Sequence, residues 1–405
     1  MIIGGDKMDF NKDFAFLKRG ITYFDNAATT LKPEIVINEI SNYYKNYSAN
    51  ANRGDYDISL KVDEKINETR KKVKEFINAQ NTYEIVFTHG ATEGLNMIIK
   101  GFLKNYLKKG DEVLTTKAEH ASLLLPLFEV AKETNSKIKY IDLKDDLSVT
   151  LENVKKCVNK NTKAIVISHI TNVIGDVRPI KEITSFAHDR GIIVIVDGAQ
   201  SVPHQKTDVT DLDIDFLVFS AHKMLGPTGV GILYGKEKHL EKMTPLITGG
   251  GMNTYFDSLM NTEYKEIPTK FEAGTLNIAG IIGLSRAIDY LNKLNMDDIH
   301  KYEVDLKKYM IDELSKLKNI IIYNKDIKNG IVTFNVDGIF AQDVASYLNK
   351  KNICVRVGSH CAKTLSEVLG VKNTCRVSLY FYNTKEDVDK LINALDNDNI
   401  LYESL

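Results

Sequence analysis

Residues 216–229 read FLVFSAHKMLGPTG, an apolar run that ends in a lysine and a glycine-rich loop. The continuous apolar character of Phe216–Ser220 is typical of a strand buried on both faces of a sheet. Lys223 follows this strand closely. Burial lowers the pKa of a lysine and prepares its amine to form a Schiff base. A single lysine is usually a solvated surface residue, so the neighbouring segments decide what this one means.

Apolar segments alternate with helical patterns on the N-terminal side of this stretch. We predict further strands at Ile85–Thr88, Glu112–Thr115, Lys137–Ile141, Ala164–Ser168 and Ile192–Val196. Helical patterns cover residues 91–106 and 121–134, and a third includes 184–189. This alternation indicates an α/β fold with a mostly parallel sheet and helices on both faces. Ligands bind at the carboxyl ends of such strands, so the residues that follow each strand are candidates for a site.

The pattern changes after about Glu272. Helical segments are predicted at 278–294, 298–317, 342–350 and from Lys385, and strands at 331–336, 353–357 and 375–380. We therefore expect a large domain over residues 20–272 and a small α+β domain over residues 273–405. Part of the N-terminal segment is expected to associate with the small domain.

Composition excludes several classes of protein. Apolar residues make up 43% of the 405 residues, as in an ordinary globular protein. The formal net charge is −1, so the protein's overall charge does not attract it to nucleic acid or to a membrane surface. The chain shows neither a membrane span of about 20 apolar residues nor an N-terminal signal peptide, which predicts a cytoplasmic protein. Cys157, Cys354, Cys361 and Cys375 form no C-x-x-C pair, and we expect no disulfide framework and no metal site.

Polar residues follow the predicted strands in an order that suits a phosphorylated aromatic ligand. Gly90-Ala91-Thr92 opens a helix, where free N–H groups and the helix dipole favour an anion. Asp197 ends a very apolar strand and is costly to bury unless a cation such as a protonated pyridine nitrogen meets it. The remaining candidates at strand ends are His120, Asn172, Gln200, Ser220, His222 and Lys223.

In combination these segments resemble the class V aminotransferases, and most of all the cysteine desulfurases of the sulfur-mobilisation type, which include selenocysteine lyase-like proteins. The resemblance runs from Tyr23 to Thr384. It is carried by DGAQ at 197–200, SAHK at 220–223, GPTG at 226–229 and FEAGT at 271–275. It implies a fold-type I pyridoxal 5′-phosphate (PLP) transferase, with PLP as the cofactor.

The resemblance also implies how the cofactor is held. Lys223 forms the Schiff base, Asp197 pairs with the pyridine nitrogen, and Gln200 contacts the phenolic oxygen. His120 stacks on the ring and takes part in catalysis, and Asn172 meets the substrate or the cofactor. The implied phosphate ligands are Ala91, Thr92, Ser220, His222 and, reaching across from a partner subunit, Thr275, which implies a homodimer.

Residues 356–362 read RVGSHCA and resemble the family's Arg-x-Gly-x-x-Cys-Ala pattern. The Gly-Ser-His turn predicts an exposed loop for Cys361, with nearby basic residues that favour the reactive thiolate. The resemblance implies that Cys361 attacks the substrate sulfur. Arg376 is implied to bind the substrate carboxylate, and Arg356 to shape the mouth of the site.

The implied function is conversion of L-cysteine to L-alanine, with the sulfur held as a persulfide on Cys361 and passed to an acceptor protein for iron–sulfur cluster assembly. Selenocysteine lyase, or another PLP-dependent amino-acid lyase, is an alternative on the same scaffold. A non-catalytic sulfur-assembly partner protein is an alternative of another class. Its signature is the loss of Lys223, Asp197 or Cys361, and all three are present. One departure from the family is Tyr56, which stands where a histidine is usual after Arg53-Gly54.

Overall fold

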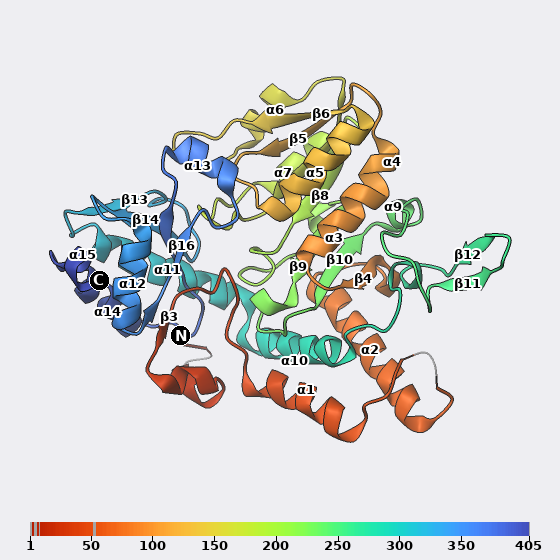
Figure 1. The fold of residues 1–405 in the computed structure, drawn as a ribbon, viewed down its shortest axis with the longest axis horizontal. Helices are drawn as coiled ribbons and strands as arrows, with labels where there is room; N and C mark the ends of the chain where they lie inside the picture. The colour runs from red at the N-terminus through yellow and green to blue at the C-terminus, as the bar shows by residue number, and fades with distance from the viewer. Residues whose placement is uncertain (1, 4–5, 8, 52–53, 405) are drawn as a thin grey trace.

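The structure is a computed structural model that describes residues 2–3, 6–7, 9–51 and 54–404. It contains a large sheet and a smaller one, each packed against its own helices (Figure 1). Asn52 and Arg53, part of the segment that resembles the family's Arg-Gly stretch, lie outside the described residues.

The large sheet has seven strands in the order β4-β10-β9-β8-β7-β5-β6. Their bounds are β4 (Ile85–Thr88), β5 (Glu112–Thr116), β6 (Lys137–Ile141), β7 (Thr162–Ser168), β8 (Ile193–Asp197), β9 (Phe216–Ser220) and β10 (Gly231–Gly235). Strand β10 pairs antiparallel with β4 and β9, and the other paired strands are parallel. The predicted α/β fold with a mostly parallel sheet is confirmed, whereas β10 was not predicted.

Strand β10 brings the chain close to the turn after β4. A Cβ atom at Gly231 would lie 2.4 Å from the Cα atom of Gly90, so this approach leaves no room for a side chain. The turn that starts the next helix is therefore held tightly against the start of β10.

Helices cover both faces of the large sheet (Figure 1). One face carries α3 (Ala91–Ile98), the π-helical turn η4 (Ile99–Leu103), α4 (Lys104–Tyr106) and α5 (Ala121–Thr134). The other carries α2 (Asp57–Phe76), α6 (Leu151–Cys157), α7 (Ile180–His188) and α10 (Ile278–Leu294), and α1 (Glu34–Asn46) packs on α10. Alternate residues of β7 enter the two cores, Ile165 and Ile167 on one face and Val166 on the other, as the strand period of two requires.

The smaller sheet is antiparallel, in the order β13-β14-β17-β16. Its strands are β13 (Ile320–Ile322), β14 (Ile331–Val336), β16 (Arg356–Gly358) and β17 (Thr374–Ser378). The helices of this part are α11 (Met296–Leu314), α12 (Ala341–Lys350), α13 (Lys363–Leu369), α14 (Lys385–Leu395) and α15 (Ile400–Ser404). The strand predicted at 353–357 is divided into β15 (Ile353–Cys354), which pairs with β3 (Thr22–Tyr23), and β16. The domain boundary at 272 stays a prediction.

A hairpin of β11 (Asn253–Phe256) and β12 (Thr262–Tyr264) projects from the body of the molecule (Figure 1). The remaining short elements are β1 (Ile2–Ile3), β2 (Asp6–Lys7), η1 (Phe10–Lys12), η2 (Ala15–Arg19), η3 (Thr82–Glu84), α8 (Val209–Leu212), η5 (Ala221–Lys223), α9 (Glu237–Leu240) and η6 (Thr269–Phe271). Over the described residues, no helix is both long and apolar enough to cross a bilayer.

Candidate active site

A cavity of about 190 Å³ lies at the carboxyl ends of the large sheet's parallel strands, where side chains of the smaller sheet also reach it. It gathers nearly all of the residues that the sequence put forward. The predicted residues that line it are Ala91, Thr92, His120, Asn172, Asp197, Gln200, Ser220, His222, Lys223, Arg356 and Arg376. Cys361 and Thr275 do not line it.

Lys223 and Asp197 both line this cavity, Asp197 as a buried carboxylate and Lys223 as a half-buried amine. Burial lowers the pKa of Lys223 to about 8, while the charge of Asp197 opposes that change. Burial raises the pKa of Asp197, and the Lys223 charge and the N–H of Ala199, which donates to Asp197 Oδ1 over 2.9 Å, counteract it. Lys223 is therefore an amine that can be neutral near physiological pH, as a Schiff-base lysine must be.

His120 is the N-cap of α5, and its ring is held in one orientation. Ser122 N donates to His120 Nδ1 over 3.1 Å, which places the ring proton on Nε2. Burial, and then the charges of Lys223, Arg356 and Arg376, lower the pKa of His120 to about 4. The imidazole is thus neutral, which suits stacking on an aromatic ring beside other cations.

The start of α3 forms the anion end of the cavity. Ala91 N donates to Ser220 Oγ over 2.8 Å, and the Thr92 and Ser122 hydroxyl oxygens are 2.7 Å apart. These hydroxyls converge on the positive end of a helix together with His222, which also lines the cavity. Such a set of donors suits a phosphate group.

Arg376 joins the two sheets through two of its nitrogens, and the third, Nε, has no partner among the described residues. Its Nη1 donates to Asn172 O over 2.8 Å and its Nη2 to Asp25 Oδ1 over 3.0 Å. Its Nε is buried and has no hydrogen-bond partner among the described residues. Because the side chain lines the cavity, this donor is available to a carboxylate that enters it.

Cys361 lies on an exposed loop between β16 and α13, as predicted. His360 and Cys361 both have left-handed backbone conformations, with φ of 51° and 58°. Asn172 Nδ2 donates to His360 O over 2.7 Å, and Ala121 N donates to Cys361 O over 2.7 Å. Ala121 follows the lining residue His120, so the backbone of Cys361 lies next to the edge of the cavity.

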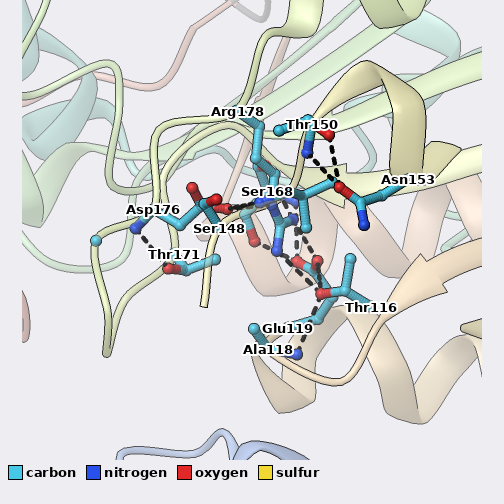
Figure 2. Close-up of polar contacts among 12 residues, drawn as sticks. Thr116, Ala118, Glu119, Ser148, Thr150, Asn153, Ser168, Thr171, Asp176 and Arg178 are labelled. Carbon is cyan, nitrogen blue, oxygen red and sulfur yellow. Dashed lines mark hydrogen bonds and ion pairs between the residues drawn. The ribbon is translucent and has the colours of Figure 1, made fainter. Parts of the chain in front are cut away.

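A buried ionic network around Arg178 joins loops that carry residues of the cavity (Figure 2). Arg178 Nη1 forms a short ion pair with Glu119, and its Nε lies 3.3 Å from Asp176 Oδ2. Glu119 also accepts from Thr116 Oγ1, over 2.7 Å, and from Ser168 N, over 2.9 Å. The network therefore joins the ends of β5 and β7 to the loop that carries Asn172, and it holds the residue just before His120.

The sequence analysis missed several residues that line the cavity. They are Ala27, Ala28, Ser122, Ser168, Ile170 and Ala199. His360, expected from the sequence as a basic neighbour of Cys361, also lines the cavity, but burial lowers its pKa to about 3, so it is neutral. Ser122 had a usable signal, because it is the second residue after His120 at a predicted helix start. Thr275 lies elsewhere, and its Oγ1 accepts from Asn50 Nδ2 over 3.3 Å.

The chemistry of the lining fits pyridoxal phosphate. Gln200 Oε1, Asn172 Oδ1 and Arg376 Nε are buried polar atoms without partners among the described residues, as expected where a polar ligand completes the site. Asp197 matches a protonated ring nitrogen, and the start of α3 matches a phosphate. His120 matches the face of a ring, and the Lys223 amine matches an aldehyde.

Comparisons with known proteins agree on one family. The family model described as aminotransferase class-V matches residues 22–391. A probable cysteine desulfurase of Halalkalibacterium halodurans is 43% identical over 93% of this chain and 92% of its own, and one of Staphylococcus aureus strain COL is 41% identical over 95% and 94%. The solved cysteine desulfurase of Thermococcus onnurineus NA1 superposes with a TM-score of 0.93 at 35% identity, covering 98% of both chains. For the cysteine desulfurase CsdA of Escherichia coli the TM-score is 0.90 at 33% identity, covering 96% of this chain and 98% of that one.

Proposed function

The chain belongs to the aminotransferase class-V family, and we propose that it is a PLP-dependent cysteine desulfurase, which converts L-cysteine to L-alanine and transfers the sulfur to Cys361. One observation carries this choice of reaction within the family. A free, exposed cysteine lies on a loop whose backbone carbonyls are held by Ala121 N and Asn172 Nδ2, at the edge of a cavity that fits the cofactor.

The residues proposed to hold PLP each contact a different part of the cofactor. Lys223 attaches it covalently, Asp197 pairs with the ring nitrogen, and His120 covers the ring. Gln200 contacts the phenolic oxygen, and Ala91, Thr92, Ser220 and His222 bind the phosphate. When bound, PLP withdraws electrons from the α-carbon of an attached amino acid and so makes its proton easier to remove.

Arg376 and Lys223 are proposed to act on the substrate. The unpaired Arg376 Nε donates to the cysteine carboxylate, and Arg356 adds positive charge at the same mouth. Once released from the cofactor, the neutral Lys223 amine takes the α-proton and later returns a proton to the carbon skeleton. Its pKa of about 8 suits both directions of this transfer.

Cys361 completes the reaction. Its thiolate attacks the substrate sulfur, a new S–S bond forms, and the Cβ–S bond of the substrate breaks. The electrons of the broken bond stay with the three-carbon fragment, which takes up a proton and leaves as alanine. In sum, cysteine and the Cys361 thiol become alanine and the Cys361 persulfide, so neither an oxidant nor a reductant is needed.

The persulfide needs an acceptor, which we propose to be a protein of iron–sulfur cluster assembly that brings its own thiol. The exposure of Cys361 supports this, because a protein partner can reach the loop directly. We also propose a cytoplasmic location. All four cysteines are free, and free cysteines suit a reducing compartment.

We further propose a homodimer. Thr275 does not line the cavity of its own chain, so a phosphate contact from it requires a second subunit. Large apolar side chains are exposed on α1, on α2 and on the β11–β12 hairpin, where a second copy would bury them. They include Ile35, Ile37, Tyr44, Ile58, Leu60, Phe256, Leu259 and Met260. A light-scattering mass of twice the 45.6 kDa chain is expected, and a monomeric mass would reject the dimer.

The test is anaerobic incubation of the holoprotein with L-cysteine and a reductant, with alanine and sulfide both quantified. Equal amounts of the two are expected. Cys361→Ala should keep the cofactor's absorbance band and lose sulfide, whereas the matched control Cys157→Ala, which changes a buried cysteine of α6, should release sulfide normally. Wild-type sulfide from Cys361→Ala would reject the role of this cysteine. Turnover of selenocysteine but not cysteine would point to the lyase instead.

A further inference from the structure

Four hydrogen bonds from one stretch of chain converge on the backbone carbonyl of His222. Thr30 N donates over 3.0 Å, Thr29 Oγ1 over 3.0 Å and Thr30 Oγ1 over 3.2 Å. The fourth donor is Lys32 Nζ, at 2.9 Å. A carbonyl oxygen has two lone pairs, so four donors are more than it needs to be satisfied.

Lys32 makes this carbonyl contact in an unusual setting. Its ammonium also donates to Thr30 O over 2.5 Å and to Thr29 Oγ1 over 3.2 Å. Within the described ranges, it forms no ion pair with a carboxylate, and burial lowers its pKa to about 7. Placing a cation among neutral oxygens costs free energy. The contacts of Lys32 are therefore expected to do more than satisfy the backbone of a loop.

The carbonyl in question belongs to the peptide bond that joins His222 to Lys223. On the other side of Lys223, Leu225 N donates to Thr30 Oγ1 over 2.9 Å. Residues 29–32 therefore hold the backbone both before and after the lysine. Lys223 itself lies in a single 3-10 turn, η5, which has little rigidity of its own.

We propose that Lys32 is a positioning residue for Lys223. Its hydrogen bond to the His222 carbonyl fixes the backbone from which the Lys223 amine reaches the cofactor. This rests on Lys223 as the attachment residue in the proposed function. The Lys223 side chain must detach from the cofactor and return to it in every cycle. A fixed backbone keeps the free amine at a high effective concentration beside the cofactor, and so favours reattachment.

Lys307 provides a matched control that separates the proposed positioning role of Lys32 from a purely structural one. Lys307, on α11, is buried where Lys32 is half-buried, and its Nζ also donates to backbone carbonyls, those of Asn324 over 3.1 Å and Ile327 over 2.6 Å. Burial lowers its pKa to about 7 as well. Lys307 does not line the cavity, so Lys307→Met reproduces the loss of a buried carbonyl-binding lysine without touching the Lys223 loop.

The experiment titrates the holoprotein with methylamine, which competes with Lys223 for the cofactor and carries no carboxylate. Borohydride then reduces the remaining link, and mass spectrometry measures the fraction of Lys223 that retains the cofactor. We expect Lys32→Met to lower the half-displacing methylamine concentration at least about tenfold. Lys307→Met should leave that concentration at the wild-type value. Because no cysteine is present, the result does not depend on the desulfurase activity.

Equal half-displacing concentrations in Lys32→Met, Lys307→Met and the wild type would overturn the proposal. If Lys32→Met does not fold, Thr29→Val removes one donor to His222 O and one partner of Lys32. It should still lower the half-displacing concentration several-fold, and a wild-type value in this variant would equally overturn the proposal.

Discussion

The backbone N–H of Ala121 donates a hydrogen bond of 2.7 Å to the backbone carbonyl of Cys361. Ala121 is the first residue of α5 and follows His120, so this bond ties the cysteine loop to the residue proposed to cover the cofactor. The amide of Asn172 holds the carbonyl of His360 in the same way. Two consecutive carbonyls of the loop are thus anchored to the rim of the cavity, and the position of the Cys361 sulfur follows from them.

Ala121→Pro should separate cofactor binding from sulfur capture. Proline is well tolerated at the first position of a helix, and the extended backbone of His120, with ψ of 147°, is compatible with a following proline. The substitution removes the N–H that holds Cys361. We expect normal cofactor content, and formation of the Cys361 persulfide slowed at least about tenfold in a single turnover, measured by mass spectrometry.

The control is Lys385→Pro, at the first position of α14, which follows a similarly extended residue, Thr384. It should leave the rate of persulfide formation unchanged. A wild-type rate in Ala121→Pro would mean that the anchor to α5 plays no part in sulfur capture.

The attachment of the cofactor should depend on pH through Lys223. A lysine attacks in its neutral form, and burial lowers the pKa of Lys223 from 10.5 to about 8. The neutral fraction therefore rises with pH and is half complete near pH 8. When PLP is added to protein stripped of cofactor, the rate of covalent attachment should rise with pH and level off above this value.

Asp197→Asn supplies the check on the cause. The charge of Asp197 raises the pKa of Lys223, so its removal should move the midpoint of attachment to lower pH. A wild-type midpoint close to the ordinary lysine value would show instead that Lys223 is not desolvated in the protein that receives the cofactor.

Most of the cavity could be predicted from the sequence because parallel strands bring their carboxyl ends to one edge. Asp197 ends such a strand, and Lys223 and Asn172 follow two others, all of which their apolar character reveals. Strand β10 was missed although Ile232, Leu233 and Tyr234 are as apolar as the strands that were predicted, and apolar content alone would not have shown that it runs antiparallel. Residues 221–230, which join β9 to β10, do carry a signal, since a parallel crossover needs a dozen or more residues.

Other parts of the site depend on contacts that no local pattern contains. Arg178 meets Glu119 only because β5 and β7 are neighbours in the sheet, although 59 positions separate the two residues. Likewise Lys32 reads as an ordinary lysine before a proline until the fold brings His222 to it. Period and composition identify which residues end strands, whereas partners far apart in the chain require the tertiary structure.

Arg376→Lys should weaken substrate binding more than it slows the reaction. Arg376 already uses two donors on Asn172 O and Asp25, and an ammonium cannot keep both contacts and also reach a carboxylate. Loss of one hydrogen bond to a charged group costs about 1.5–3 kcal/mol, which is about 10- to 150-fold in the KM for cysteine. Steady-state kinetics measure this directly. A KM that stays at the wild-type value would place the substrate carboxylate elsewhere.

The buried network in Figure 2 predicts a large loss of stability when its cation is removed. Arg178→Met leaves Glu119 and Asp176 without their guanidinium, in a place where the Arg178 and Glu119 side chains are fully buried. An uncompensated buried charge costs about 3–5 kcal/mol, so the thermal midpoint should fall clearly. Calorimetry of the protein stripped of cofactor measures this without a contribution from PLP.

The double variant Arg178→Met with Glu119→Gln tests whether charge is the cause. It should recover part of the loss, because the unpaired carboxylate of Glu119 is then neutral. Lys181→Met breaks an exposed ion pair with Asp211, which solvent screens, and should leave the thermal midpoint close to the wild-type value. If Arg178→Met and Lys181→Met had the same thermal midpoint, the network would not be what holds β5, β7 and the Asn172 loop together. The arrangement of His120 and Asn172 around the cavity would then need another cause.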